Sequence, residues 1–207
     1  MRYPSDQALD YAALTSLVRD LLPTEGPFVV LGESFSGPIA ITLAAEAPPR
    51  MQGLILCCTF ARNPYPGLAP LKHLLPLMPL GALPTTALDA ALLGKWATPA
   101  LRAVAAQAVR QVAPNVLRAR MRAALSVDVR PQLAQLEMPC LYLQASHDRL
   151  VPPSAAKLIE ATLPSTVVMP LAAPHGLLQT VPAAAALAVS SFIEGLVRKQ
   201  PADGPNR

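Results

Sequence analysis

Four short, mostly apolar runs divide the chain, and segments with helical periodicity lie between them. The runs are Phe28 to Leu31, Leu54 to Cys58, Pro139 to Leu143 and Thr166 to Met169. A continuous apolar run of this length is typical of a strand that is buried on both faces of a parallel sheet. The alternation of strands with helices predicts βαβ units, and therefore an α/β fold with a mostly parallel, doubly wound sheet.

Apolar residues at helical spacing, together with capping residues, predict where the helices lie. Ser5 and Asp6 are candidate N-terminal caps for a first helix. A second helix is expected over residues 35–47, and later helices are expected over 153–162 and 181–197. These segments connect or flank the predicted strands, as the helices of βαβ units do.

The segment 63–127 interrupts this alternation. Six prolines fall within residues 63–84, a density that excludes a long helix or strand there. Thr98 followed by Pro99 predicts the start of a helix, and another helix is expected over 115–125. The predicted parts of the chain are therefore an α/β core over 1–62 and 128–199, a helical cap or lid insertion over 63–127, and a disordered tail over 200–207.

Composition agrees with one sizeable globular domain. The chain has 207 residues, of which 52% are hydrophobic and 14% are charged. It lacks an uninterrupted apolar run of 18 residues and a charged-then-apolar N-terminal signal, so we expect no transmembrane segment and a cytoplasmic location. Cys57, Cys58 and Cys140 lie in apolar runs without metal-ligand spacing, which predicts buried, reduced thiols.

Charge gives little support for a nucleic-acid partner. The net charge is +4, but the arginines are mostly scattered and aromatic residues make up only 4% of the chain. The one local cluster is Arg118, Arg120 and Arg122, whose alternate spacing spreads the side chains around a helix. A solvated helix face is the favoured interpretation of this cluster, and binding of an acidic group is the alternative.

Ser34 is the first of three polar residues that follow predicted strands. It lies in Gly32-Glu33-Ser34-Phe35-Ser36-Gly37, where a strand is expected to end and a helix to begin. This segment resembles the nucleophile elbow of the α/β hydrolases, a sharp strand-to-helix turn that exposes the serine hydroxyl at the sheet edge. It departs from the usual pattern at Ser36, where the family has glycine. The alternatives are that Ser34 only caps the helix, or that Ser36 is the nucleophile.

Asp148 and His175 follow the third and fourth predicted strands. Taken singly, Asp148 could only cap the helix near Pro153, and His175 could be a loop residue without a role. In the order Ser…Asp…His, however, the three residues match the catalytic triad of the α/β hydrolases. His147 precedes the acid and His73 lies in the proline-rich segment, so neither matches the family's histidine.

The resemblance implies a serine hydrolase with Ser34, Asp148 and His175 as its triad. His175 would take the proton of Ser34, the serine would attack a carbonyl, and an acyl-enzyme would form and be hydrolysed. The Phe35 N–H would serve the oxyanion hole. The apolar segment Gly67 to Gly94 lies where the family has a cap, so the expected substrate is a small, apolar ester or thioester. No cofactor and no metal are expected.

The N-terminus departs from the family, because few residues precede the elbow. Full-length members have further strands there, and a loop commonly marked His-Gly gives the second oxyanion N–H. The only such pair here is His175-Gly176. We therefore expect a weakened oxyanion hole and an open sheet edge, which favours aggregation or homodimerisation. A fragment of a longer chain and a naturally short, weak or inactive scaffold that pairs with another chain both stay open.

Overall fold

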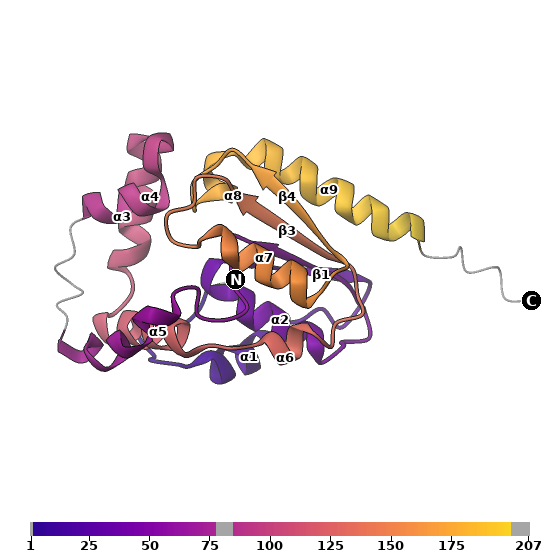
Figure 1. Cartoon of the computed structure of the whole chain (residues 1–207), viewed down its shortest axis with the longest axis horizontal. Helices are drawn as coiled ribbons and strands as arrows, with labels where there is room; N and C mark the ends of the chain where they lie inside the picture. Colours follow the sequence, from indigo (N-terminus) through magenta and orange to yellow (C-terminus); the bar gives the residue numbers. More distant parts are fainter. Residues whose placement is uncertain (1, 78–84, 200–207) are drawn as a thin grey trace, which may run out of the picture.

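A computed structural model describes residues 2–77 and 85–199. At its centre is a four-stranded sheet in which all strands are parallel and lie in the order β1-β2-β3-β4 (Figure 1). The strands are β1 (Phe28–Glu33), β2 (Met51–Cys57), β3 (Cys140–Ala145) and β4 (Thr166–Leu171). The four apolar runs of the sequence therefore all form strands, and each strand extends beyond the predicted run at one end.

The two central strands bury side chains on both faces of the sheet. Leu54 and Leu56 of β2 pack into one hydrophobic cluster, whereas Ile55 and Cys57 pack into another on the opposite face. All four side chains are completely buried. Because successive strand residues point to opposite faces, a strand covered on both sides must be apolar at every position. This double coverage explains the continuous apolar pattern of the central strands.

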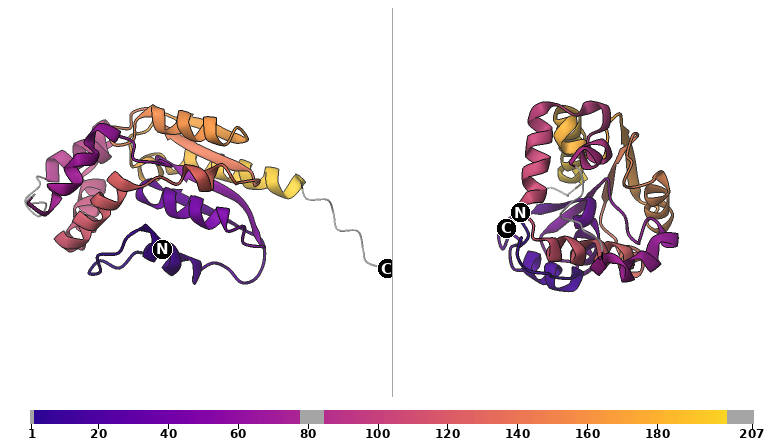
Figure 2. Two further views of the ribbon diagram at one scale, coloured as in Figure 1. Left: turned by 60° about the horizontal axis from the view of Figure 1, so that its bottom comes forward. Right: turned by 90° about the vertical axis from the view of Figure 1, so that its left-hand side faces the viewer.

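Helices cover both faces of the sheet, and α1 adds an outer layer. The first hydrophobic cluster lies between the sheet and the helices that connect the strands, which are α2 (Gly37–Ala45), α6 (Arg130–Leu133) and α7 (Pro153–Thr162). The second cluster lies under the C-terminal helices, α8 (Leu177–Thr180) and α9 (Pro182–Lys199). Helix α1 (Tyr11–Arg19) packs on the outer side of α2 (Figure 2).

The segment between β2 and α6 lies beyond the carboxyl ends of the strands (Figure 1). Its described residues, 63–77 and 85–127, form the helices α3, α4 and α5 and the 3₁₀ helices η2, η3 and η5, of which η2 packs against α5. Their bounds are η2 (Pro66–His73), η3 (Leu75–Leu77), α3 (Thr85–Leu92), η5 (Gly94–Trp96), α4 (Pro99–Arg110) and α5 (Pro114–Ser126). We refer to residues 63–127 as the cap segment; that it acts as a lid stays a prediction.

Some element boundaries differ from the sequence predictions. Helix α1 is capped by Asp10, whose carboxylate accepts a hydrogen bond from the Ala13 N–H at 2.9 Å, so Ser5 and Asp6 are not its caps. The prediction for Thr98 is confirmed, because its hydroxyl oxygen accepts the Leu101 N–H. Short 3₁₀ helices form in the proline-rich segment, where a proline in the first turn sacrifices no helical hydrogen bond.

Three further predictions concern the cysteine thiols, membrane-spanning helices and the C-terminal tail. All three cysteines are free and buried, as expected, and burial raises the pKa of the Cys140 thiol to about 12. None of the described helices has the length and hydropathy needed to cross a membrane. The predicted tail, 200–207, lies outside the described residues.

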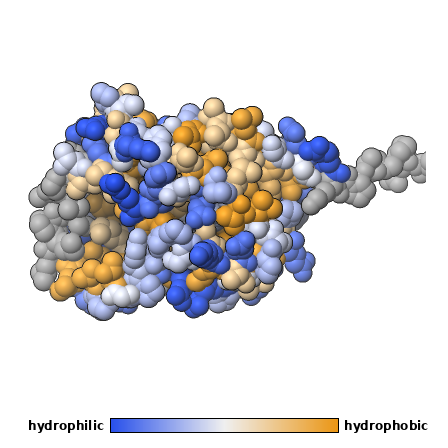
Figure 3. All heavy atoms as spheres, turned by 45° about the horizontal axis from the view of Figure 1, so that its top comes forward, coloured by the Kyte–Doolittle hydropathy of each residue, from blue (hydrophilic) through white to orange (hydrophobic). Residues whose placement is uncertain are grey.

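Apolar side chains also remain on the outer surface, as Figure 3 shows. Val167 on β4 and Leu187 and Val197 on α9 are each more than half exposed. Within the described residues β1 has a strand partner on one side only, and Leu31 on it is partly exposed. The outer edge of β1 is therefore the open edge that the sequence predicted.

Candidate active site

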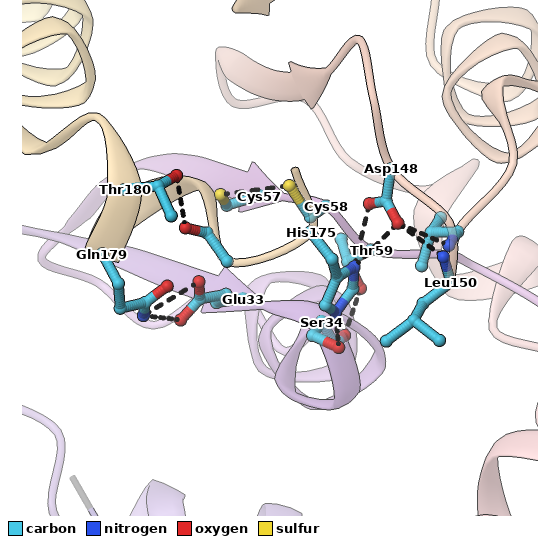
Figure 4. A network of polar contacts seen from close by, with 12 residues as sticks. Glu33, Ser34, Cys57, Cys58, Thr59, Asp148, Leu150, His175, Gln179 and Thr180 are labelled. Atoms are coloured by element: carbon cyan, nitrogen blue, oxygen red, sulfur yellow. Dashed lines mark hydrogen bonds and ion pairs between the residues drawn. The ribbon is translucent and has the colours of Figure 1, made fainter. Parts of the chain in front are cut away.

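Three residues that follow separate strands come together at one edge of the sheet (Figure 4). The Ser34 Oγ lies 2.7 Å from Nε2 of His175, and Nδ1 of His175 lies 2.9 and 3.0 Å from the two oxygens of Asp148. A carboxylate can only accept hydrogen bonds, so Nδ1 carries the proton. In the neutral ring Nε2 is then an acceptor, and the Ser34 hydroxyl donates to it.

The backbone at Ser34 is held in a conformation that few non-glycine residues adopt. Its φ angle is 52°, and it begins a short 3₁₀ helix (η1, Ser34–Ser36) that leads directly into α2. A side chain at Gly32 would place its Cβ 2.7 Å from the Cβ of Ala40, so this position has room only for glycine. The strand and helix therefore approach closely, and the strained turn persists because its surroundings hold it.

Ser36 is accommodated where related elbows have glycine, because its side chain points away from the crowded side of the turn. Its Oγ lines a cavity and accepts a hydrogen bond from the Tyr3 hydroxyl at 2.9 Å. The crowded position is Gly37, where a Cβ would lie 1.9 Å from Oγ1 of Thr59. Glycine is thus needed one residue later than the usual pattern places it.

Thr59 and Tyr142 support the turn at Ser34 through hydrogen bonds, and the sequence predictions missed both residues. The Thr59 hydroxyl donates a hydrogen bond to the Ser34 carbonyl oxygen. The Tyr142 hydroxyl donates to the Thr59 carbonyl at 2.7 Å and accepts from the Thr59 N–H at 3.2 Å. Thr59 and Tyr142 are almost completely buried. The available signal was positional, because Thr59 is the first polar residue after a buried strand and Tyr142 is a polar residue within one.

The acid is fixed by its own loop and does not cap α7. Oδ1 of Asp148 accepts the N–H groups of Leu150 and Val151, both at 2.8 Å. The loop is also joined to the histidine loop, because the His147 N–H donates to the Ala173 carbonyl at 3.0 Å. The side chains of Asp148 and His175 are only 5% and 6% exposed. Both are therefore oriented by several bonds in a site that excludes most water.

Two further contacts tie the histidine loop to its neighbours. The Gly176 N–H donates to the Leu92 carbonyl at 2.8 Å, which joins this loop to the cap segment. The Gln179 amide donates to both carboxylate oxygens of Glu33, each at 3.2 Å. Burial raises the pKa of Glu33, and the bond from Gln179 opposes the rise. Glu33 directly precedes Ser34, the candidate nucleophile, so the contact with Gln179 connects the serine turn to the segment that follows His175.

The other two histidines lie elsewhere. His147 packs edge-to-face against Trp96, with ring centroids 5.0 Å apart. His73 is exposed on η2. His175 is therefore the histidine that the fold brings to Ser34, as the chain order predicts.

A cavity of about 610 Å³ opens beside the Ser34 hydroxyl, between the sheet edge and the cap segment. Its walls are mostly apolar, and the cap segment contributes Leu68, Leu71, Leu75, Leu117 and Met121. Trp96 of the cap segment does not line this cavity. The volume and the apolar walls are typical of pockets for small organic ligands.

Arg120 also lines this cavity, which corrects one prediction about the arginine cluster. Arg122 is exposed, as a solvated helix face requires, but Arg120 is half-buried. Its guanidinium donates to the Pro4 carbonyl at 3.0 Å and lies 5.8 Å from the centre of the Tyr3 ring. Burial lowers the pKa of Arg120 and raises the pKa of Tyr3. Alternate spacing alone cannot show which of the three side chains faces the cavity.

The parallel sheet, the strained serine turn and the hydrogen-bonded Ser34, His175 and Asp148 define an α/β hydrolase. The chain belongs to the hydrolase family described as serine aminopeptidase, S33, whose family model matches residues 4–177. A solved hydrolase from Oleispira antarctica superposes with a TM-score of 0.75 at 18% identity, over 89% of this chain and 72% of that one. This likeness shows the same fold.

Two curated relatives are named pimeloyl-[acyl-carrier protein] methyl ester esterase. The one from Serratia marcescens is 29% identical, over 77% of this chain and 66% of its own length. The one from Neisseria meningitidis is 28% identical, over 94% of this chain and 65% of its own length. The chain thus spans slightly less than two thirds of these relatives.

Proposed function

We propose that this chain is a serine hydrolase that cleaves carboxylic esters, with Ser34 as nucleophile, His175 as general base and Asp148 as the acid that orients His175. The observation that carries the proposal is the continuous hydrogen-bonded path from Ser34 Oγ through the His175 ring to Asp148, with distances of 2.7 and 2.9 Å. The strained backbone at Ser34 supports it independently, because such strain is characteristic of functional positions.

The reaction follows from this arrangement. Nε2 of His175 accepts the hydroxyl proton while Ser34 Oγ forms a bond to the ester carbonyl carbon. The tetrahedral intermediate collapses when the carbon–oxygen bond to the alcohol breaks, and the alcohol leaves with the proton from His175. Water then attacks the acyl-enzyme, His175 accepts its proton, and the carboxylic acid leaves as Ser34 recovers its hydrogen. Asp148 stays ionised and stabilises the imidazolium that forms in each half.

The negative charge on the carbonyl oxygen needs hydrogen-bond donors. The Phe35 N–H stands at the start of the η1–α2 helical segment, where backbone N–H groups lack helical acceptors and the helix dipole favours negative charge. We assign it as one oxyanion donor. A site with a single such donor would lose about 10²–10³ in kcat relative to a site with two.

The cavity supports a substrate with an apolar acyl chain. It adjoins the Ser34 hydroxyl and is enclosed mainly by leucine and methionine side chains of the cap segment, which therefore acts as a lid over the acyl group in this proposal. The names of the curated relatives, esterases that act on a methyl ester of an acyl chain, are compatible with a small alcohol and a long acyl group. Thioesters and lactones have the same carbonyl chemistry and are natural comparison substrates.

Steady-state hydrolysis of p-nitrophenyl esters tests the proposal. The parent should hydrolyse them, and Ser34→Ala should lower kcat by about 10⁴ or more because the nucleophile is removed. Ser36→Ala is the matched control, since it removes a hydroxyl two residues away and should retain activity within about tenfold of the parent. Equal rates for parent and Ser34→Ala, or loss confined to Ser36→Ala, would contradict the assignment.

A second candidate function is a scaffold that pairs with another chain, and the open edge of β1 favours it. An apolar groove of about 270 Å³ lies beside this edge, between Phe28 and Val29 of β1 and Ile193, Leu196 and Val197 of α9. Two copies could pair there through strand edges. A dimer at micromolar concentration without ester hydrolysis, measured by light scattering and the assay above, would favour the scaffold over the enzyme.

A further inference from the structure

Arg120 places a permanent positive charge in the wall of an otherwise mainly apolar cavity. Of the described residues that line the cavity beside Ser34, it is the only Lys, Arg, Asp or Glu. It projects from α5 of the cap segment, whereas Ser34 belongs to the sheet edge. A molecule that fills the cavity would therefore contact both the serine and the guanidinium.

The guanidinium retains unused hydrogen-bond capacity. It has five N–H donors, and one bond to a protein acceptor runs from Nη2 to the Pro4 carbonyl. The Tyr3 ring, whose centre lies 5.8 Å from the guanidinium carbon, holds the side chain through a cation–π contact. Within residues 2–77 and 85–199 no carboxylate forms an ion pair with Arg120.

Most of the other polar side chains that line the cavity are hydrogen-bonded to protein groups. The Asn63 amide donates to the Leu125 carbonyl and its oxygen accepts the Tyr65 N–H. Tyr3 and Ser36 are bonded to each other, and Ser34 is bonded to His175. Arg120 is consequently the wall residue with the most donors left for a ligand.

A half-buried cation without a counter-charge is unfavourable for the free protein. Burial lowers the pKa of Arg120, which is the same cost expressed as a weaker preference for the proton. An anion that enters the cavity relieves this cost, and its attraction to the guanidinium is stronger there than in bulk water because the apolar walls lower the local dielectric response. The planar guanidinium matches a carboxylate with two parallel hydrogen bonds.

We infer that Arg120 binds a carboxylate at the far end of the acyl chain, so that the preferred substrates are half-esters of dicarboxylic acids. This inference rests on the proposed function, which puts the acyl chain in the cavity and the ester carbonyl at Ser34. The apolar walls bind the methylene chain, and Arg120 selects the charged terminus. Arg120 is a specificity residue in this account and takes no part in proton transfer.

Substrate pairs that differ only in terminal charge test the inference. The probes are the monomethyl and dimethyl esters of succinic, adipic and suberic acid, compared by kcat/KM. The parent should prefer at least one monomethyl ester over its dimethyl partner by about tenfold or more, the range expected for a charge-assisted hydrogen bond. Arg120→Gln should remove this preference, mainly through a rise of about tenfold in KM for the monomethyl ester.

Arg122→Gln is the matched control, because it removes the same charge from an exposed position on the same helix. It should keep the preference, and Arg120→Lys, which keeps the charge but not the planar fork, should retain part of it. Thermal melts of all variants report whether loss of the bond to the Pro4 carbonyl unfolds the chain. Arg120→Met, which preserves the aliphatic stem, replaces Arg120→Gln if that variant does not fold.

Binding to Ser34→Ala separates this inference from the proposed function, because calorimetry needs no turnover. If Ser34→Ala binds monomethyl suberate at least tenfold more tightly than dimethyl suberate and Arg120→Gln abolishes the difference, the inference holds even if the parent is inactive. Equal hydrolysis of both esters by the parent, unchanged in Arg120→Gln, would overturn the inference and leave the esterase proposal intact. Loss of the preference in Arg122→Gln as well would also overturn it.

Discussion

The loops at the carboxyl ends of the strands and the cap segment are held in place by different interactions. At the sheet edge, positions are over-determined: Ser34, Asp148 and His175 are joined to one another and to loops that are themselves cross-linked. In the cap segment, α4 has no fully buried residue, although its sequence is amphipathic. Hydrogen bonds therefore fix the side chains at the carboxyl ends of the strands, whereas α4 of the cap segment is held with little burial of its side chains.

The largest difference should appear when the acid is altered. Asp148→Asn keeps the size and an oxygen for the Leu150 and Val151 N–H groups, but its amide group cannot accept the His175 Nδ1 proton in the same geometry. We expect a loss of roughly 10³–10⁴ in kcat/KM, as found when a triad histidine is held in the wrong tautomer. Asp128→Asn, which removes an exposed carboxylate beside Arg130, is the control and should cost less than about twofold.

The next largest difference should be in the free energy of unfolding, when a glycine near Ser34 and a glycine of the cap segment are each replaced by alanine. At Gly37 the new Cβ would lie 1.9 Å from Oγ1 of Thr59, so Gly37→Ala must displace the residue that supports the Ser34 carbonyl. We expect a destabilisation of about 2–4 kcal/mol by urea unfolding, together with slower ester hydrolysis. Gly67→Ala in the cap segment meets open space and should stay within about 0.5 kcal/mol. Equal effects at both glycines would contradict the contrast.

Much of the sheet edge could be predicted from sequence, because its residues follow strongly apolar strands in a fixed order. The strands, Ser34 and His175 all emerged from that pattern. Thr59 and Tyr142 did not, because a bond to a backbone carbonyl across the sheet leaves no periodic trace. In the cap segment, neither α3 nor the orientation of Arg120 was predicted, because prolines and weak periodicity leave the packing to tertiary contacts.

A pH series separates the half-buried carboxylate of Glu33, next to Ser34, from the exposed carboxylate of Glu46 at the C-terminal end of α2. Burial raises the pKa of Glu33, so the folded state binds this proton more tightly than the unfolded chain, and stability falls as pH rises from the unfolded pKa through the folded one. Glu33→Gln removes that penalty. The Tm of the variant relative to the parent should therefore rise as the pH increases above about 4, by a few degrees at most.

The pKa of Glu46 is shifted in the opposite direction, so its effect on stability has the opposite dependence on pH. Its pKa is lowered by the hydrogen bond from Arg19, so this carboxylate stabilises the fold above its unfolded pKa, and the contribution disappears as pH falls through the folded pKa. Glu46→Gln should then be slightly less stable than the parent at neutral pH and equal to it in acid. The same trend for both variants would show that Glu33 is not penalised by burial.

The smallest effect should come from the cap segment. Leu75 is buried and lines the cavity, whereas its neighbour Leu74 is half exposed and does not. Leu75→Ala should lower kcat/KM for p-nitrophenyl octanoate about 3–10-fold more than for the acetate, because contacts with the longer chain are lost. Leu74→Ala should leave kcat/KM for both esters close to the values of the parent. Equal rates for acetate and octanoate in the parent would argue against an acyl chain in this cavity.

The most direct test of the account is covalent labelling of the intact chain by a fluorophosphonate, followed by mass spectrometry, because the probe reacts only with an activated serine. We expect one adduct on the parent, one on Ser36→Ala, none on Ser34→Ala and strongly slowed labelling of His175→Ala. An unlabelled parent that still unfolds cooperatively in urea, or a parent labelled at a residue other than Ser34, would contradict it.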